Sequence, residues 1–137
     1  MKNFYFDVTI HLADTDATGV IFFPRLFEKC VIGLESFLEK NHLRGLLIEN
    51  KFLFPVIHAQ SQYLAPIRPY DELKGEMSVI RIGQTSMTFM YKFIDKNGLL
   101  SAEASVVHVC VDPKTKAKKA LPDHWIEIFK AIHPHKA

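Results

Sequence analysis

The chain is poor in cysteine, with only Cys30 and Cys110 among its 137 residues. Neither has a CxxC partner or a histidine at the spacing of zinc ligands, which argues against a zinc site and against a disulfide framework. Both lie in apolar segments, so we expect two small buried side chains in a reducing compartment. Walker loops and the GxGxxG and GxSxG motifs are also missing, and with them the common nucleotide-binding and serine-hydrolase signatures.

The chain also lacks a marked excess of charge and any long apolar run. Lys and Arg number 17 and Asp and Glu 15, which leaves a formal net charge of +2. The densest basic run, KTKAKK at residues 114–119, is typical of a solvated turn, so we expect no nucleic-acid partner. The N-terminal MKNFYFDV has no apolar signal segment, and no run approaches the about 20 apolar residues of a membrane span. We therefore expect a cytoplasmic protein with no membrane partner.

Repeats, low-complexity tracts and Gly/Ser linkers are missing as well, so we expect one domain over residues 1–137. Hydrophobic residues make up 48% of the chain, enough for a core without disulfides or metal. Residues 4–12 are rich in aromatic and β-branched side chains and predict a strand. Pro24 then opens a helix that runs to residue 41 or 42.

The predicted helix carries an apolar stripe at the 3.6-residue spacing of a mostly buried helix. The members of the stripe are Leu26, Phe27, Cys30, Val31, Leu34, Phe37 and Leu38. The charged residues assigned to its other faces are Glu28, Lys29, Glu35, Glu39 and Lys40.

Beyond residue 54 the pattern changes to that of strands, predicted at residues 56–65, 72–82, 86–94 and 100–111. Gly83-Gln84 and the DKNG sequence at 95–98 indicate antiparallel hairpins. Pro122 begins a short C-terminal helix with Trp125, Ile128 and Phe129. The fold class is therefore α+β, with one long central helix, a five-stranded antiparallel sheet and a short C-terminal helix.

Three segments carry motifs that occur together in one family. Residues 11–24 are HLADTDATGVIFFP, with a D-x-D-x-x-G loop before an apolar pair; residues 63–71 are YLAPIRPYD; and VCVDP at 109–113 precedes ALP at 120–122. In this order they resemble the 4-hydroxybenzoyl-CoA thioesterase family, which implies the hotdog fold, a long helix wrapped by the sheet. Pro24 stands where the Tol–Pal-associated branch commonly has histidine, and the Phe23-Pro24 step resembles the aroyl-CoA branch. Within that branch LADTD, FPVIHAQ at 54–60 and VHVC at 107–110 are similar to the 1,4-dihydroxy-2-naphthoyl-CoA thioesterases.

Hydrolysis of a thioester needs a nucleophile or base and a donor for the developing oxyanion. The resemblance assigns the first role to Asp16 and the second to the backbone N–H of Phe23, at the start of the helix; Arg25 is the other local donor. The alternative for Asp16 is a carboxylate that only orders its own turn. Asp14 is expected to be a loop-ordering acceptor, since no further acidic cluster completes a metal site. Some hotdog thioesterases carry the carboxylate on the helix, where Glu28 and Glu35 are the candidates and a solvated flank is the simpler explanation.

Further candidates concern the substrate. Gly19 lets the loop approach a ligand closely or simply makes a turn, and Phe22 and Pro24 lie at the loop–helix junction. His58, Gln60 and Gln62 alternate along one strand face and suit either substrate hydroxyls or a solvent-facing polar row. Positional candidates for the coenzyme A phosphates are Arg68, Arg81, Gln84, Thr85 and Ser86. His108 is expected to be a core histidine, and His133 and His135 make a poor metal site.

The resemblance implies an enzyme that hydrolyses an acyl- or aroyl-CoA thioester, with 1,4-dihydroxy-2-naphthoyl-CoA or a related hydroxyaroyl-CoA as first choice. Coenzyme A would be part of the substrate and no separate cofactor is expected. The alternatives are a generic short- or medium-chain acyl-CoA thioesterase and a non-catalytic thioester-binding module. Hydratases of the fold need a histidine five residues after the aspartate, which no aspartate here has.

We expect a homodimer, or a tetramer of two such dimers, because an isolated sheet leaves its edges unpaired.

Overall fold

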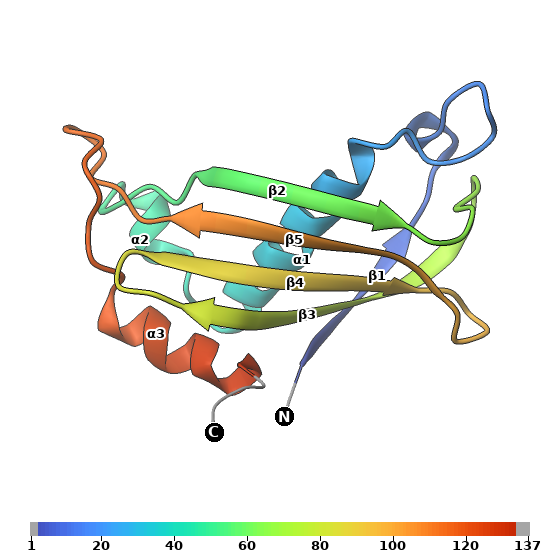
Figure 1. Cartoon of the computed structure of the whole chain (residues 1–137). Helices are drawn as coiled ribbons and strands as arrows, with labels where there is room; N and C mark the ends of the chain where they lie inside the picture. The colour runs from blue at the N-terminus through green and yellow to red at the C-terminus, as the bar shows by residue number, and fades with distance from the viewer. Residues whose placement is uncertain (1–2, 134–137) are drawn as a thin grey trace.

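The computed structural model describes residues 3–133 and contains one five-stranded sheet with a long helix across one face (Figure 1). Its strands are β1 (Phe4–Thr9), β2 (Val56–Tyr63), β3 (Glu72–Ile82), β4 (Ser86–Ile94) and β5 (Leu100–Val109). Its helices are the 3-10 turn η1 (Leu12–Asp14), α1 (Arg25–Lys40), α2 (Gly45–Ile48), α3 (Asp123–Phe129) and the 3-10 turn η2 (Lys130–Ile132). The order across the sheet is β1-β3-β4-β5-β2, and every neighbouring pair is antiparallel. The predicted α+β architecture is confirmed.

The long helix α1 lies as predicted, but two of its residues were assigned to the wrong side. Its buried apolar residues are Leu26, Cys30, Leu34, Phe37 and Leu38. Val31 was placed in the buried stripe and is 52% exposed, because it lies on the flank of α1 that the described part of the chain leaves uncovered. Lys29 was placed on an outer face and is only 7% exposed, because its ammonium group pairs with a buried carboxylate.

Phe6 fills the space between α1 and the sheet. It pairs with Gly75 of β3 across the ladder, and Gly33 of α1 lies over the same ring. A Cβ built on either glycine would come within 2.4 Å of the ring tip. The two glycines therefore allow the helix to approach the sheet closely.

The C-terminal helix α3 closes one end of the core with Trp125 and Phe129, both buried. The ring of Phe129 stacks on Phe37 of α1 with a centroid distance of 4.7 Å, which connects the two helices.

His108 is the buried core histidine that the sequence predicts: its Nδ1 lies 2.8 Å from the carbonyl oxygen of Phe54. Both cysteines are buried, also as predicted. His135 lies outside the described residues.

Several strand ends differ from the prediction by two or three residues. β1 ends at Thr9 and not at residue 12, because the chain turns into η1, whose start is held by the bond from the His11 N–H to the carboxylate of Asp14 at 2.8 Å. β2 ends at Tyr63, because the N–H groups of residues 64 and 65 both donate to the carbonyl of Ser101. β5 ends at Val109 and the chain then continues in isolated bridges at Val111. These ends set the loops in which the candidate site lies.

Candidate active site

The acidic loop between η1 and α1 folds back on itself as a small hairpin. Thr15 forms a bridge with Ile21, and the N–H of Asp16 donates to the carbonyl of Val20 at 3.0 Å. Gly19 lies in the left-handed region with φ of +84° and donates to the carbonyl of Asp16. A residue with a side chain would be strained at this position. The local sequence therefore places Asp16 at the exposed turn of the hairpin.

The carboxylate of Asp16 is exposed and bound on one oxygen only. Its Oδ1 accepts hydrogen bonds from Oγ1 of Thr18 at 2.5 Å and from the Thr18 N–H at 2.9 Å. The Thr18 hydroxyl, and after it the Thr18 N–H, lowers the pKa of Asp16 below its ordinary value. Oδ2 receives no hydrogen bond from any residue that the structure describes. At neutral pH the loop thus presents an ionised carboxylate with a free oxygen.

Asp14 has the opposite environment, although it is only two residues away. It is 5% exposed, and its Oδ2 accepts bonds from Nζ of Lys29 at 2.9 Å and from the His11 N–H at 2.8 Å. Burial alone would raise the pKa of Asp14, but the His11 N–H and the Lys29 ammonium outweigh it and lower that pKa. Asp14 is therefore a loop-ordering acceptor, as the sequence predicts. Residues 3–133 hold no cluster of three or more His, Cys, Asp or Glu placed to bind a metal ion.

The two residues directly before Pro24 differ in how their N–H groups are used. The N–H of Phe22 donates to the Asp14 carbonyl, and that of Arg25 to the Phe22 carbonyl, both at 2.8 Å. The N–H of Phe23 has no acceptor among residues 3–133. Of the two predicted oxyanion donors, Phe23 and Arg25, only Phe23 is unoccupied. It lies beside Pro24, which occupies the N-cap position of α1.

Tyr63, which the sequence offers only as the first residue of the motif at 63–71, is a further candidate site residue. Its hydroxyl, at the end of β2, donates to the backbone carbonyl of Phe23. This contact connects residues 40 positions apart, and only the topology of the sheet reveals it. Phe22 and Phe23 are 44% and 63% exposed, and the centroids of their rings are 5.4 Å apart. The loop–helix junction is thus an exposed aromatic surface.

The helix carboxylates have the solvated environment expected of them. Glu28 accepts a bond from Arg25 at 3.1 Å, and Glu35 one from Arg44 at 3.2 Å. The side chains of Glu28 and Glu35 are more than half exposed. Neither has a pair of donors comparable to those that hold Asp16.

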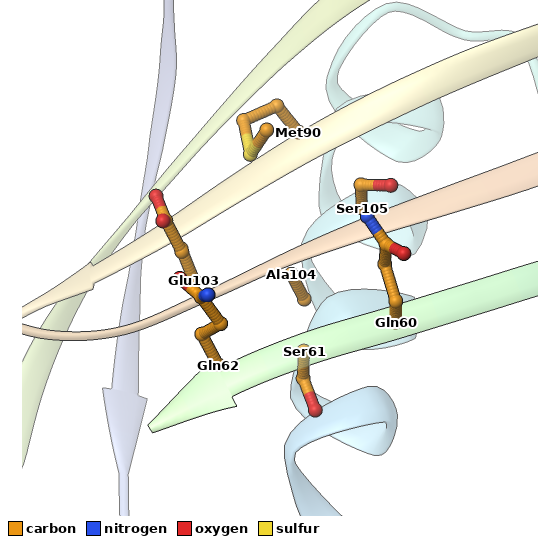
Figure 2. Close-up of a pocket in the computed structure, with 7 residues that line it drawn as sticks. All are labelled: Gln60, Ser61, Gln62, Met90, Glu103, Ala104 and Ser105. Atoms are coloured by element: carbon orange, nitrogen blue, oxygen red, sulfur yellow. The ribbon is translucent and has the colours of Figure 1, made fainter. Parts of the chain in front are cut away.

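The polar row on β2 points away from α1. In the register with β5, His58 pairs with Val107, Gln60 with Ser105 and Gln62 with Glu103. Figure 2 shows Gln60 and Gln62 gathered with Met90, Glu103 and Ser105 around a pocket on this face of the sheet. Within one chain, His58 and Gln60 therefore lie on the opposite face from α1 and its N-terminal junction.

The candidate coenzyme A residues fall into two groups at opposite ends of the sheet (Figure 1). Arg68 lies near the acidic loop, since the carbonyl of Ile67 accepts the N–H of Ile21. Arg81, Gln84, Thr85 and Ser86 lie around the β3–β4 turn. β3 has 11 residues and at about 3.3 Å per residue spans roughly 35 Å. One chain therefore does not bring the second group to Asp16.

Comparison with known proteins identifies the family of the chain. A family model described as the thioesterase-like superfamily matches residues 10–129. A 1,4-dihydroxy-2-naphthoyl-CoA hydrolase of Synechocystis sp. is 27% identical over 128 residues, covering 91% of this chain and 93% of that protein. A hydrolase of the same name from Prochlorococcus marinus is 30% identical over 122 residues, covering 82% of this chain and 78% of that protein.

The solved structures that resemble the chain include relatives of the same kind. The crystal structure of a 1,4-dihydroxy-2-naphthoyl-CoA thioesterase from Synechocystis superposes with a TM-score of 0.86 at 26% identity, covering 93% of this chain and 96% of that one. The family match covers 120 of the 137 residues, from 10 to 129, and the chain belongs to the thioesterase-like superfamily.

Proposed function

We propose that this protein hydrolyses an aroyl-CoA thioester to the free acid and coenzyme A, with 1,4-dihydroxy-2-naphthoyl-CoA as the first substrate to test. The observation that carries the proposal is that one loop–helix segment holds both an ionised, exposed Asp16 and the unoccupied N–H of Phe23 at the start of α1. The two named hydrolases and the crystal structure described above supply the substrate class.

In the proposed reaction the thioester carbonyl lies between the acidic loop and the helix start. Asp16 either activates a water molecule or attacks the carbonyl carbon itself, which would give a mixed anhydride that water then opens. The carbonyl oxygen becomes negative as the new bond forms, and the Phe23 N–H donates to it at the positive end of the helix dipole. Collapse breaks the C–S bond and releases the thiol of coenzyme A. The products are the free acid and coenzyme A.

The aromatic surface of Phe22 and Phe23 favours a flat acyl group, because rings stack or pack on it edge to face. Gly19 and Pro24 would border the same space. His58 and Gln60 are proposed to contact ring hydroxyls, and because they lie on the opposite face from the junction within one chain, this contact would need a second copy of the chain. Groups that hydrogen-bond a hydroxyl would select against acyl groups that lack it. An aroyl-CoA with ring hydroxyls should therefore be preferred to a straight-chain acyl-CoA.

The proposed active form is a homodimer that joins two copies along β2, with a tetramer of two such dimers as the larger possibility. Almost all of β2 is exposed, and Val56, Ile57 and Tyr63 are 40 to 60% exposed although apolar. An edge strand of this length is a template for pairing. A two-fold axis beside β2 reverses the second copy, so its β3–β4 turn with Arg81 and Ser86 comes to the Asp16 end of the first. That arrangement would join the two separated groups of coenzyme A candidates.

Light scattering at micromolar concentration tests the assembly, and a dimer or tetramer is expected. Ile57→Lys places a charge on the β2 edge and should shift the protein towards monomer and lower its activity. Tyr5→Lys on the other edge, where Tyr5 is 56% exposed, is the matched control. A monomeric wild-type protein with full activity would refute the dimer.

Steady-state hydrolysis across a panel of CoA esters tests the function. The panel comprises 1,4-dihydroxy-2-naphthoyl, 4-hydroxybenzoyl, benzoyl, butyryl and palmitoyl esters, with released thiol measured. We expect the hydroxylated aroyl esters to have the highest kcat/KM, and His58→Ala to lose part of that preference while Gln62→Ala keeps it. Equal rates for all esters would indicate a generic acyl-CoA thioesterase, and tight binding without turnover would indicate a non-catalytic module.

No helix in residues 3–133 is long and apolar enough to cross a membrane. We propose a cytoplasmic location, where coenzyme A esters are formed and the buried thiols of Cys30 and Cys110 stay reduced. No cofactor beyond the coenzyme A of the substrate is part of the proposal. Fractionation of the source cells with an antibody against the protein tests the location.

A further inference from the structure

We propose that Lys29 is a positioning residue for the reaction, acting through Asp14 to hold Asp16 and the Phe23 N–H in place relative to each other. The inference rests on the proposed function for its catalytic meaning. That one buried ion pair sets the conformation of the acidic loop follows from the contacts of Lys29 and Asp14 alone. Lys29 itself touches neither of the two groups assigned to the chemistry.

The ion pair joins two elements that carry different parts of the site. Lys29 lies in the second turn of α1, and Asp14 is the last residue of η1. The Nζ–Oδ2 distance is 2.9 Å, and the exposed fractions of the two side chains are 8% and 7%. Because the pair is shielded from water, its attraction is screened little by solvent or salt. The start of the acidic loop is thus held against the helix that begins the other side of the site.

The backbone of Asp14 extends this connection to both catalytic candidates. Its carbonyl accepts the N–H of Phe22, the residue directly before the proposed oxyanion donor. In the residues that follow, Thr15 forms an antiparallel β-bridge with Ile21, and the N–H of Asp16 donates to the carbonyl of Val20. If Asp14 moves, the hairpin that presents Asp16 and the peptide before Phe23 move as well.

Among residues 3–133, Arg25 is the one other Lys or Arg within 4.0 Å of the Asp14 carboxylate, and it is poorly placed to replace Lys29. The guanidinium of Arg25 is 4.0 Å from Oδ1 of Asp14 and closer, at 3.1 Å, to Glu28. Without Lys29 the buried carboxylate would keep the His11 N–H as its only hydrogen-bond donor among the described residues. A buried carboxylate with one donor is costly, so the loop would open to hydrate it.

The test uses the full chain with Lys29→Met, Lys29→Arg and the double variant Asp14→Asn/Lys29→Met. The double variant removes both charges, and neutral replacement of a buried pair is often tolerated, so it should fold even where the single variant does not. Lys74→Met is the matched control, because Lys74 makes an exposed ion pair with Asp7 at 2.6 Å on β1–β3. Activity is measured with the best ester of the panel, per folded protein, and thermal unfolding is measured alongside.

We expect kcat to fall about 10- to 100-fold in Lys29→Met and in the double variant, because small misplacements of reacting groups have effects of that size. KM should change by less than about threefold, since the aromatic surface remains. Lys29→Arg should recover most of the loss, and Lys74→Met should match the wild type. A double variant that folds and turns over at the wild-type rate would overturn the proposal.

Amide hydrogen exchange gives a readout that needs no substrate. The N–H groups of Asp16 and Phe22 should exchange at least about tenfold faster in the double variant and remain unchanged in Lys74→Met. Unchanged exchange at these two amides would overturn the proposal whatever the activity. If the wild type hydrolyses no ester of the panel but exchange rises as expected, the proposed function fails while the role of Lys29 in holding the loop stands.

Discussion

Gly33 of α1 gives a sharp test of how the helix is seated on the sheet. Gly33→Ala would place a Cβ 2.4 Å from the tip of the Phe6 ring. Carbon atoms in ordinary contact are about 3.5 to 4.0 Å apart, so the ring tip or the helix would have to move by more than about 1 Å. The ring cannot move towards the sheet, because it already lies against Gly75. The rings of Tyr91 and Phe93 also pack on it edge to face, with centroids 6.5 and 6.2 Å from its own.

Two opposing effects set the size of the change. Overpacking of a filled core costs about 1 to 3 kcal/mol, whereas alanine in place of glycine within a helix stabilises by about 1 kcal/mol. The net expectation is a loss of about 1 kcal/mol in the free energy of unfolding. For a chain of this length that corresponds to a fall in Tm of about 3 to 5 °C.

The cause is isolated by a cycle with Phe6→Leu, whose shorter side chain lacks the ring tip. In the Phe6→Leu background Gly33→Ala should be neutral or stabilising, so the coupling energy between the two sites should be about 1 to 3 kcal/mol. Thermal and urea unfolding followed by circular dichroism at one fixed protein concentration measures it, since the Tm of an oligomer depends on concentration. A stabilising Gly33→Ala in the wild type, or an equal cost in both backgrounds, would refute the close approach of helix and sheet at this point.

Three further predictions concern ionisable groups. Asp16→Asn should lower kcat by about 10²-fold or more without loss of fold, the scale of a lost base or nucleophile; near-normal turnover would remove Asp16 from the chemistry. Thr18→Ala deletes the shorter hydrogen bond to Asp16, so the pKa of Asp16 should rise towards its ordinary value. The acid limb of the pH profile of kcat/KM should then move to higher pH. Burial lowers the pKa of His108, so the folded protein keeps it neutral while the unfolded chain binds a proton below about pH 6.5. The free energy of unfolding should therefore fall as pH drops below that value, and His108→Asn should flatten this dependence.

The periodic elements of the fold were accessible from the sequence because each leaves a local pattern. The apolar stripe predicts α1 to within two residues of its end at Lys40, and the DKNG turn predicts the hairpin of β4 and β5. The hairpin of β3 and β4 follows in the same way from Gly83. Strand ends were less accessible, because contacts with distant residues, such as the carbonyl of Ser101, determine where β2 stops.

Val31 and Lys29 show where helical periodicity misassigns a side chain. Periodicity ranks positions by angle around the helix axis and treats a charged residue as solvent-facing. It has no information on the partner that makes burial of a charge tolerable, and here that partner, Asp14, lies 15 residues earlier in the chain. It equally has no information on where the sheet ends, so it counts Val31 as covered although this residue is 52% exposed.

The same distinction applies to the candidate site. Asp16, Gly19 and Phe23 belong to one short segment, so a local motif was enough to find them and the hairpin geometry follows from it. Tyr63 and Lys29 reach that segment from another strand and from the helix, and only the folded chain shows these two contacts, although Tyr63 itself begins the motif at 63–71. Because one of these contacts holds the carbonyl of Phe23 and the other the carboxylate of Asp14, the segment is fixed from both of its ends. The motif thus supplies the proposed reacting groups, and the fold supplies their alignment, which is why a change at Lys29 should affect turnover more than substrate binding.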